Sequence, residues 1–267
     1  ELFKLDQELN PVVVAGVPPD YFSETGQKWG NPVFDWGFLQ KNDFGWWVER
    51  MKHNLDLFDL VRIDHFRGFL AAWEIPANDS TAVNGRWQES PGVEFFSVLL
   101  HECKSIPVVA EDLGVITQDV RDAMARFGFP GMKLLIFAFD GDILQNPYAP
   151  ENHVKNCVLY TGTHDCNTMR GWFEEELSDE SKVKLEKILG KKIYSDTVSE
   201  EMVVLAMSSI ADMVILPMQD VLGLGSEARM NCPGVAENNW EWRLLPGQWS
   251  TCIAAKLAHT TKTHGRD

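Results

Sequence analysis

The chain has 267 residues, of which 45% are hydrophobic and 11% aromatic, and its mean hydropathy of −0.19 is typical of a folded globular protein. Acidic residues outnumber basic ones by 39 to 24, which gives a formal net charge of −15 and disfavours binding to nucleic acid or to an anionic membrane surface. No apolar run reaches the roughly 18 to 20 residues that a membrane span needs. The longest candidate, 202–218, is interrupted by Asp212 and Pro217, so we expect it to be core.

The start of the chain and its cysteines bear on its context. Residues 1–6 lack an initiator Met and the basic and apolar regions of a signal peptide, so we expect the chain to begin within a longer protein. Its five cysteines form an odd set without a C-x-x-C pair. This pattern predicts free thiols in a reducing compartment rather than disulfides or a structural zinc site.

Short apolar runs that end on polar or charged residues predict buried strands of a parallel sheet. Between them, segments with apolar residues at helical spacing or with helix-start residues predict helices. In chain order, we expect strands at 57–63, 106–110, 132–139, 157–160 and 213–216, and helices at 91–104, 117–127 and 178–189. No linker or internal repeat divides the chain, so we expect one compact domain over 1–267.

Alternating strands and helices leave two architectures, an open doubly wound sheet and a (β/α)8 barrel. A doubly wound nucleotide-binding sheet would carry a glycine-rich turn, and the sequence contains neither G-x-G-x-x-G nor a P-loop. A barrel brings the carboxyl ends of its strands to one opening, and three of the runs end in Asp or Glu beside His or another carboxylate. We therefore predict an α/β fold of the (β/α)8 type, of which five strands form only a part.

The candidate catalytic residues are the strand-end carboxylates Asp64, Glu111 and Asp165. Glycosyl transfer needs one carboxylate as nucleophile or base and another as proton donor. Arg62, two residues before Asp64, is expected on the same side of the strand, where its charge would keep Asp64 ionised. Partial burial and the like charge of Asp112 are expected to raise the pKa of Glu111, as a general acid requires.

Two His/Asp pairs also allow a metal-dependent barrel hydrolase, since Asp64-His65 and His164-Asp165 both stand at strand ends. The sequence has no H-x-H or H-E-x-x-H motif, so we predict no metal site. His65 and His164 would instead donate hydrogen bonds to sugar hydroxyls, and a solvated structural role for both is the alternative.

A polar, turn-rich loop near the N-terminus carries the aromatic residues Tyr21, Phe22 and Trp29. Sugar rings present apolar faces that pack on aromatic planes, so this composition suits an oligosaccharide groove. Aromatic side chains more often fill a core, which is the alternative for this loop.

Several strings are far more specific than their chemistry alone. They include VAGVPPDYFSETGQKWGNP (14–32), RIDHFRGF (62–69), VVAEDLGVIT (108–117), FPGMKLLIFAF (129–139), YTGTHD (160–165), PMQDVLGLGSEARMNCPG (217–234) and NWEWR (239–243). On these strings the chain resembles, nearly end to end, the 4-alpha-glucanotransferases called amylomaltases or disproportionating enzymes, within the α-amylase clan.

The resemblance implies a retaining transfer of α-1,4-glucan segments between malto-oligosaccharides, without a cofactor. Asp64 would be the nucleophile that forms a covalent glycosyl-enzyme, Glu111 the general acid/base and Asp165 the transition-state stabiliser. The substrate contacts that the resemblance implies are Arg62, His65, His164, Tyr21, Phe22, Trp29, Phe137 and Asn231. A hydrolase of the same clan and an inactive glucan-binding fragment are the alternatives.

The chain also departs from the family pattern. Family members are much longer, so we expect this chain to cover strands 4 to 8 of the barrel and to need a missing N-terminal half or self-association to complete it. Cys166 follows the THD string where Asn is usual, and Asn238 stands where Gly is usual, which predicts an altered turn. Family members occur in the bacterial cytoplasm, the expected location, and in plastids, the alternative.

Overall fold

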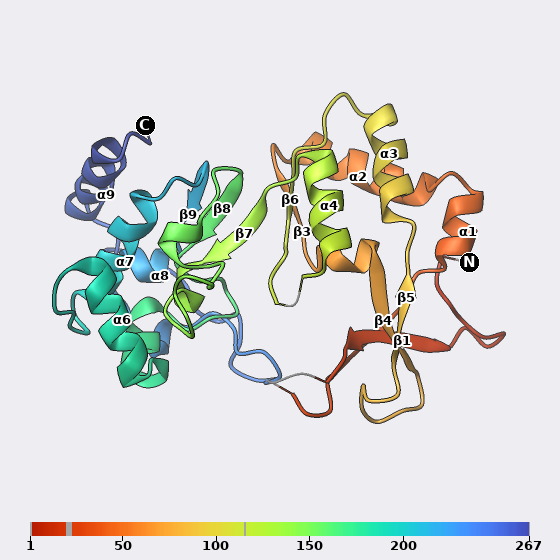
Figure 1. Ribbon diagram of the computed structural model, residues 1–267, viewed down its shortest axis with the longest axis horizontal. Helices are drawn as coiled ribbons and strands as arrows, with labels where there is room; N and C mark the ends of the chain where they lie inside the picture. Colours follow the sequence, from red (N-terminus) through yellow and green to blue (C-terminus); the bar gives the residue numbers. More distant parts are fainter. Residues whose placement is uncertain (1, 20–22, 115, 267) are drawn as a thin grey trace. The chain divides into compact units, whose positions relative to one another are not determined.

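A computed structural model describes residues 2–19, 23–114 and 116–266, so Tyr21 and Phe22 lie outside the described residues. The chain divides into two compact units, Glu1–Gly131 and Met132–Asp267 (Figure 1). The single domain over 1–267 that the sequence predicts stays a prediction.

An antiparallel sheet in the first unit was not predicted. Within the described residues, its strands are hydrogen-bonded in the order β2-β1-β4-β5. Their bounds are β1 (Val13–Val17), β2 (Gln27–Pro32), β4 (Ala71–Pro76) and β5 (Arg86–Glu89). Strand β5 is exposed along its length and β2 almost so, and they lack the alternating apolar pattern from which a half-buried strand is recognised. Gly16 allows β1 and β2 to approach, because a Cβ there would collide with the carbonyl oxygen of Gln27.

The rest of the first unit follows the predicted alternation of strands and helices. Its elements are α1 (Trp36–Lys41), α2 (Gly45–Leu57), β3 (Val61–Ile63), a 3-10 helix (Phe66–Phe69), α3 (Gly92–Glu102), β6 (Val108–Ala110) and α4 (Gln118–Phe127). Strands β3 and β6 are parallel, with Val61 opposite Val108 and Ile63 opposite Ala110. The predicted strand 57–63 began too early, because Leu57 still belongs to α2.

Aromatic side chains fill the core between this strand pair and the helices. Phe66, Phe95 and Phe96 are fully buried, and the ring centroids of Phe95 and Phe96 lie 4.8 Å apart. Phe66 and Phe69 come from the 3-10 helix that directly follows the end of β3. The core therefore fixes the segment just beyond β3, where the first of the candidate carboxylates lies.

The second unit contains parallel strands with helices around them. Its elements are β7 (Gly131–Leu134), β8 (Cys157–Tyr160), α5 (Met169–Gly171), a π-helical turn (Trp172–Glu176), α6 (Asp179–Leu189), α7 (Val198–Met207), β9 (Met213–Ile215), α8 (Met218–Val221) and α9 (Thr251–Thr263). The strands lie in the order β7-β8-β9, and β8 is parallel to β9. The predicted strand 132–139 ends at Leu134, because the chain turns into a 3-10 helix over Leu135–Phe137.

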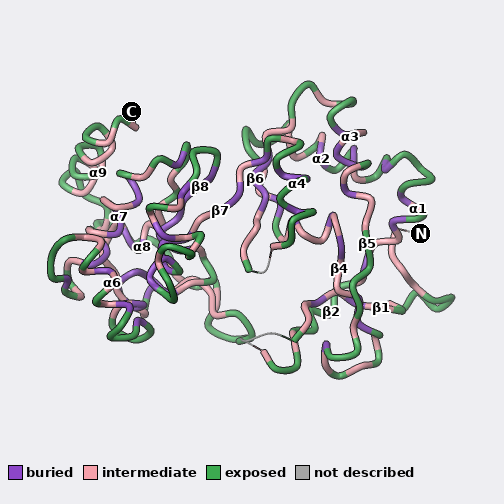
Figure 2. Tube along the Cα trace, viewed as in Figure 1, coloured by how far each residue is buried: buried purple, intermediate pink, exposed green. Residues whose placement is uncertain are grey.

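Burial distinguishes the strands of this sheet. All of β8 is buried, as a continuous apolar run predicts, and it is purple in Figure 2. On β9, in contrast, Met213 and Ile215 are 40% and 41% exposed. The run 202–218 was predicted to be core, and this is right for Met202 on α7 and wrong for β9.

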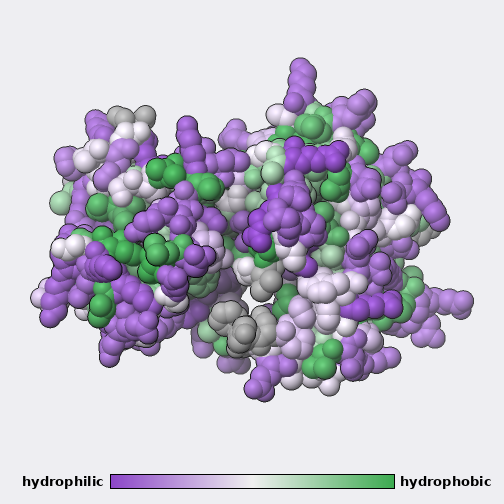
Figure 3. Space-filling model, viewed as in Figure 1, coloured by the Kyte–Doolittle hydropathy of each residue, from purple (hydrophilic) through white to green (hydrophobic). Residues whose placement is uncertain are grey.

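The surface and the cysteines agree with the composition. Hydrophilic side chains cover most of the visible face of each unit, with apolar ones scattered among them (Figure 3). All five cysteines are free, as predicted. In the described part of the chain, no helix combines the length and the apolar character that crossing a membrane requires.

Candidate active site

Asp64 and Glu111 stand at the carboxyl ends of the neighbouring parallel strands β3 and β6. The Glu111 N–H donates to the Ile63 carbonyl oxygen at 2.9 Å, and the Phe66 N–H donates to the Glu111 carbonyl oxygen at 3.2 Å. Parallel pairing brings such strand ends to one edge of the sheet. The structure thus brings together two of the three carboxylates that the sequence singled out.

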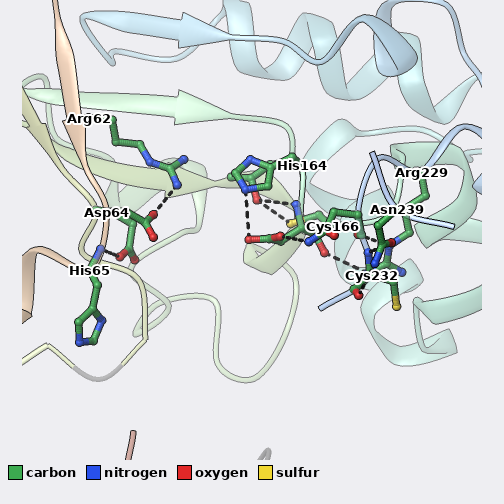
Figure 4. Close-up of polar contacts among 12 residues, drawn as sticks. Arg62, Asp64, His65, His164, Cys166, Arg229, Cys232 and Asn239 are labelled. Carbon is green, nitrogen blue, oxygen red and sulfur yellow. Dashed lines mark hydrogen bonds and ion pairs between the residues drawn. The ribbon is translucent and has the colours of Figure 1, made fainter. Parts of the chain in front are cut away.

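Arg62 and Asp64 form an ion pair, with 2.5 Å between Nη2 and Oδ1 (Figure 4). The pairing confirms that the two side chains, two residues apart, lie on the same side of the chain. The Asp64 side chain is 75% exposed, whereas that of Arg62 is 28% exposed. The exposed Asp64 carboxylate is therefore accessible to a ligand while it stays paired with Arg62.

Glu111 lies deeper than Asp64. Its Oε2 accepts a hydrogen bond from the His65 N–H at 2.6 Å, and its Oε1 accepts one from the Leu113 N–H at 2.8 Å. Burial raises the pKa of Glu111, the charge of Asp64 raises it further, and the two N–H donors act against that shift. The direction predicted from sequence is right, but the contributing like charge is Asp64, just beyond the end of the adjacent strand β3, not Asp112.

The raised pKa of Glu111 predicts a pH-dependent stability. The folded state holds the Glu111 proton more tightly than the unfolded state. This group therefore makes folding less favourable as pH rises above 4.5, the usual pKa of a glutamate. We expect the wild type to lose stability relative to Glu111→Gln between about pH 4 and about pH 8, as measured by urea unfolding.

The matched control is Glu102→Gln. The pKa of Glu102 is lowered from its usual 4.5, first by the hydrogen bond from Lys52. The wild type should therefore lose stability relative to Glu102→Gln as pH falls below about 4.5, which is the opposite sign to that of Glu111. A wild type that gains stability relative to Glu111→Gln as pH rises would contradict the prediction.

His65 sits in a left-handed backbone conformation, with φ 46° and ψ 52°. This conformation is uncommon outside glycine, and here it directs the His65 N–H to Glu111. The His65 ring lies edge-on to Trp29, with 4.8 Å between the ring centroids, and burial lowers the pKa of His65. The structure therefore joins Trp29 to His65, and a lowered pKa favours a neutral imidazole.

In the second unit, Asp165 lies in the loop after β8. Its Oδ1 accepts a hydrogen bond from Asn231 Nδ2 at 2.6 Å, and its Oδ2 lies 3.4 Å from His164 Nε2 (Figure 4). The structure thus brings together three of the residues singled out from sequence. The His164 ring also contacts Trp240, with 5.1 Å between the ring centroids.

The turn before Trp240 has the backbone that glycine favours. Asn238 has φ 59° and Trp240 has φ 63°, both in the left-handed region. Next to Asn238, the Asn239 side chain accepts from the Cys232 N–H at 2.8 Å and donates to the Val235 carbonyl oxygen at 2.7 Å. Asn tolerates the left-handed conformation better than other residues with a Cβ, so the turn forms without glycine.

Substitutions at Asn238 should separate backbone strain from lost contacts. We expect Asn238→Gly to be nearly neutral and Asn238→Ala to cost about 1 kcal/mol of unfolding free energy, because alanine is strained at positive φ. Urea unfolding of the two variants measures this difference. Equal stability of the glycine and alanine variants would show that the left-handed turn does not contribute.

Two further predictions from sequence concern the substrate contact Phe137 and the absence of a metal site. Phe137 is 41% exposed and packs edge-on against Tyr148, with ring centroids 5.5 Å apart. Within residues 2–19, 23–114 and 116–266, no group of three or more His, Cys, Asp or Glu side chains is arranged to hold a metal ion.

Other residues that contact this part of the site were not singled out from sequence. Arg229 Nη2 donates to the Asp165 carbonyl oxygen at 3.0 Å, and Arg229 Nη1 lies 3.3 Å from Glu176 Oε1. Asp220 accepts hydrogen bonds from the same loop at Thr161 and Met169. Arg229 and Asp220 lie within the string 217–234, so that string was the available signal, whereas Glu176 lies in no matched string.

Comparison with known proteins identifies the family. A family model described as 4-alpha-glucanotransferase matches residues 1–248. The chain belongs to this family. It is 50% identical over 265 residues to the 4-alpha-glucanotransferase of Thermus thermophilus, which covers 96% of this chain and 52% of that protein. It is 46% identical over 268 residues to the chloroplastic/amyloplastic 4-alpha-glucanotransferase of Solanum tuberosum, which covers 99% of this chain and 46% of that protein.

A solved structure agrees with these matches. The amylomaltase from Streptococcus agalactiae, in complex with acarbose, is 35% identical with a TM-score of 0.95, over 99% of this chain and 53% of that one. The likeness to this family member implies the (β/α)8 barrel predicted from sequence, and the parallel strand pairs β3-β6 and β8-β9 are consistent with a part of it. The chain spans about half the length of the curated relatives it matches.

Proposed function

We propose that this chain is the part of a retaining 4-alpha-glucanotransferase that carries its three catalytic acids. The observation that carries the proposal is the arrangement at the ends of β3 and β6. An exposed Asp64 is paired with Arg62, and beside it a half-buried Glu111 has a raised pKa. Two carboxyl groups whose environments differ in this way suit the separate tasks of nucleophile and proton donor.

The reaction proceeds in two steps with balanced proton transfers. Asp64 attacks the anomeric carbon of an α-1,4-glucan while Glu111 gives its proton to the departing glycosidic oxygen, which leaves a glycosyl ester on Asp64. In the second step, the 4-hydroxyl of another malto-oligosaccharide attacks the anomeric carbon of this ester and breaks its bond to Asp64, and Glu111 takes the hydroxyl proton. The Asp64 carboxylate is released, and the anomeric configuration is retained after the two inversions.

The other residues bind the sugar and stabilise the transition state. Asp165, with its hydrogen bond from Asn231, supplies negative charge to the oxocarbenium-like transition state. Arg62, His65 and His164 contact sugar hydroxyls. The aromatic residues Trp29, Tyr21, Phe22 and Phe137 contact sugar faces. No cofactor takes part in either step.

The chain forms strands 4 to 8 of the barrel, and another polypeptide segment completes it. The exposed Met213 and Ile215 on β9, which lies at the edge of its sheet, support this part of the proposal. Such an edge exposes unpaired N–H and C=O groups that another strand can satisfy. The completing segment is the missing N-terminal half or a second copy of this chain. The location follows the relatives: the cytoplasm, with a plastid as the alternative, as in the name of the Solanum tuberosum relative.

Maltotriose tests the proposal. The chain is incubated with this trisaccharide alone and after co-expression with the part of the Thermus thermophilus relative that the match leaves out. Glucose together with a ladder of longer oligomers is the expected product pattern. Products no longer than maltotriose would indicate the hydrolase, and glucan binding without any products would indicate an inactive binding fragment.

A further inference from the structure

The loop that carries Asp165 is held at both of its ends by one buried carboxylate. Asp220, on α8, is 2% exposed. It accepts hydrogen bonds from Thr161 Oγ1 at 2.5 Å and from the Met169 N–H at 2.8 Å. The two ends of the loop 161–169 are therefore fixed to α8, and the position of Asp165 in the middle of the loop depends on other contacts.

Arg229 supplies some of these contacts through its three guanidinium nitrogens, and the Asp165 N–H also donates to Thr163 Oγ1 at 3.4 Å. Nη2 donates to the Asp165 carbonyl oxygen at 3.0 Å, Nε donates to the Asn231 carbonyl oxygen at 3.0 Å, and Nη1 lies 3.3 Å from Glu176 Oε1. The planar guanidinium holds its donors at fixed angles. Arg229 thereby sets the spacing between the backbones of Asp165 and Asn231, whose side chains bond to each other at 2.6 Å.

Glu176 closes a ring of contacts around the loop. Its Oε1 also accepts a hydrogen bond from Asn167 Nδ2 at 3.0 Å. Asn167 is 5% exposed and lies two residues after Asp165. The loop is thus joined to Glu176 through Asn167 and to Arg229 through Asp165, while Glu176 and Arg229 are joined to each other.

We infer that Arg229 and Glu176 are positioning residues that orient the Asp165 carboxylate. Arg229 holds the two carbonyl groups on either side of the bond between Asn231 and Asp165, and Glu176 fixes the direction of the guanidinium. The importance of this orientation for transfer rests on the proposed function. The orientation itself does not, so it can be tested without activity.

The test follows the Asn231 side-chain amide by NMR in the chain itself. In the wild type, we expect one Nδ2 proton to exchange slowly with solvent because it is donated to a carboxylate. In Arg229→Gln and in Glu176→Gln, this protection should be lost, together with backbone protection over 163–167. Arg229→Lys can pair with Glu176 but cannot hold both carbonyls, so it should recover stability without recovering the protected amide.

The matched control is Arg170→Gln, which removes another arginine–glutamate pair of the same unit, Arg170 with Glu174. This variant should keep the protected Asn231 proton. A protected amide in a folded Arg229→Gln or Glu176→Gln variant would overturn the inference. If one variant fails to fold, the other decides the result.

Kinetics of the completed enzyme provide a second readout. Misplacing a reacting group by about 1 Å costs on the order of a hundredfold in rate, so kcat should fall by that factor in Arg229→Gln while KM stays near that of the wild type. If Arg229→Gln loses the protected Asn231 amide proton but keeps the wild-type kcat, the orientation of Asp165 does not matter for catalysis, and that part of the inference is overturned. A wild-type completed enzyme without activity would contradict the proposed function, and the NMR result would still decide the positioning role.

Discussion

Replacing Asp64 by Asn should abolish transfer in the completed enzyme. We expect kcat to fall by on the order of 10⁴-fold or more, because an amide oxygen cannot form the glycosyl ester on which both steps depend. Binding of malto-oligosaccharides should change little, since Asn keeps the size of the side chain. The measurement is initial-rate kinetics with maltotriose, together with mass spectrometry for a covalent glycosyl adduct, which should be absent in the variant.

Asp59→Asn is the matched control for this prediction. Asp59 is exposed and lies five residues before Asp64, ahead of β3. The Asp59→Asn substitution removes one negative charge from the same region without changing a residue at the strand end. The activity of this variant should therefore equal that of the wild type. An Asp64→Asn enzyme that keeps a tenth or more of the wild-type rate would exclude Asp64 as the nucleophile.

Replacing Glu111 by Gln should also stop transfer, by a different route. General acid catalysis contributes roughly 10² to 10⁴-fold, and we expect a loss of about 10³-fold. In the wild type, kcat/KM should fall as pH rises and Glu111 loses its proton. Because burial raises the pKa of Glu111, this fall should occur at a higher pH than an exposed glutamate would give.

A substrate that needs no proton donor separates the roles of the two acids. Fluoride departs without protonation, so maltosyl fluoride should form the glycosyl adduct on Asp64 in Glu111→Gln but not in Asp64→Asn. Glu94→Gln, a substitution of an exposed residue on α3, is the control. This variant should keep both transfer from maltotriose and adduct formation with maltosyl fluoride. Failure of maltosyl fluoride to label Glu111→Gln would show that Glu111 has another role.

Local sequence was sufficient to find Asp64, Glu111 and Arg62. Each carboxylate follows an apolar run, and the end of such a run predicts the end of a strand. Arg62 and Asp64 are two residues apart, so the period of a strand predicted their side. Local sequence did not show which negative charge raises the pKa of Glu111. The parallel register of β3 and β6 places Asp64 beside Glu111, although 47 positions separate them in the chain.

Other parts of the fold gave little local signal. The antiparallel sheet was missed because the exposed β5 and the nearly exposed β2 have no apolar period to recognise. The strand 132–139 was drawn too long, because buried residues of a 3-10 turn are as apolar as those of a strand. Short apolar runs do not distinguish these two conformations.

By itself, the sequence determined the alternation of strands and helices, the acids at the strand ends, the free cysteines and the family, because these depend on residue type, short spacing or whole strings. Only the tertiary structure decided how the carboxylates are held. Arg229 contacts Asp165 across 64 residues and Glu176 across 53, and Asp220 contacts Met169 across 51. Contacts over such separations form only when distant segments pack together, so no local pattern in the chain records them.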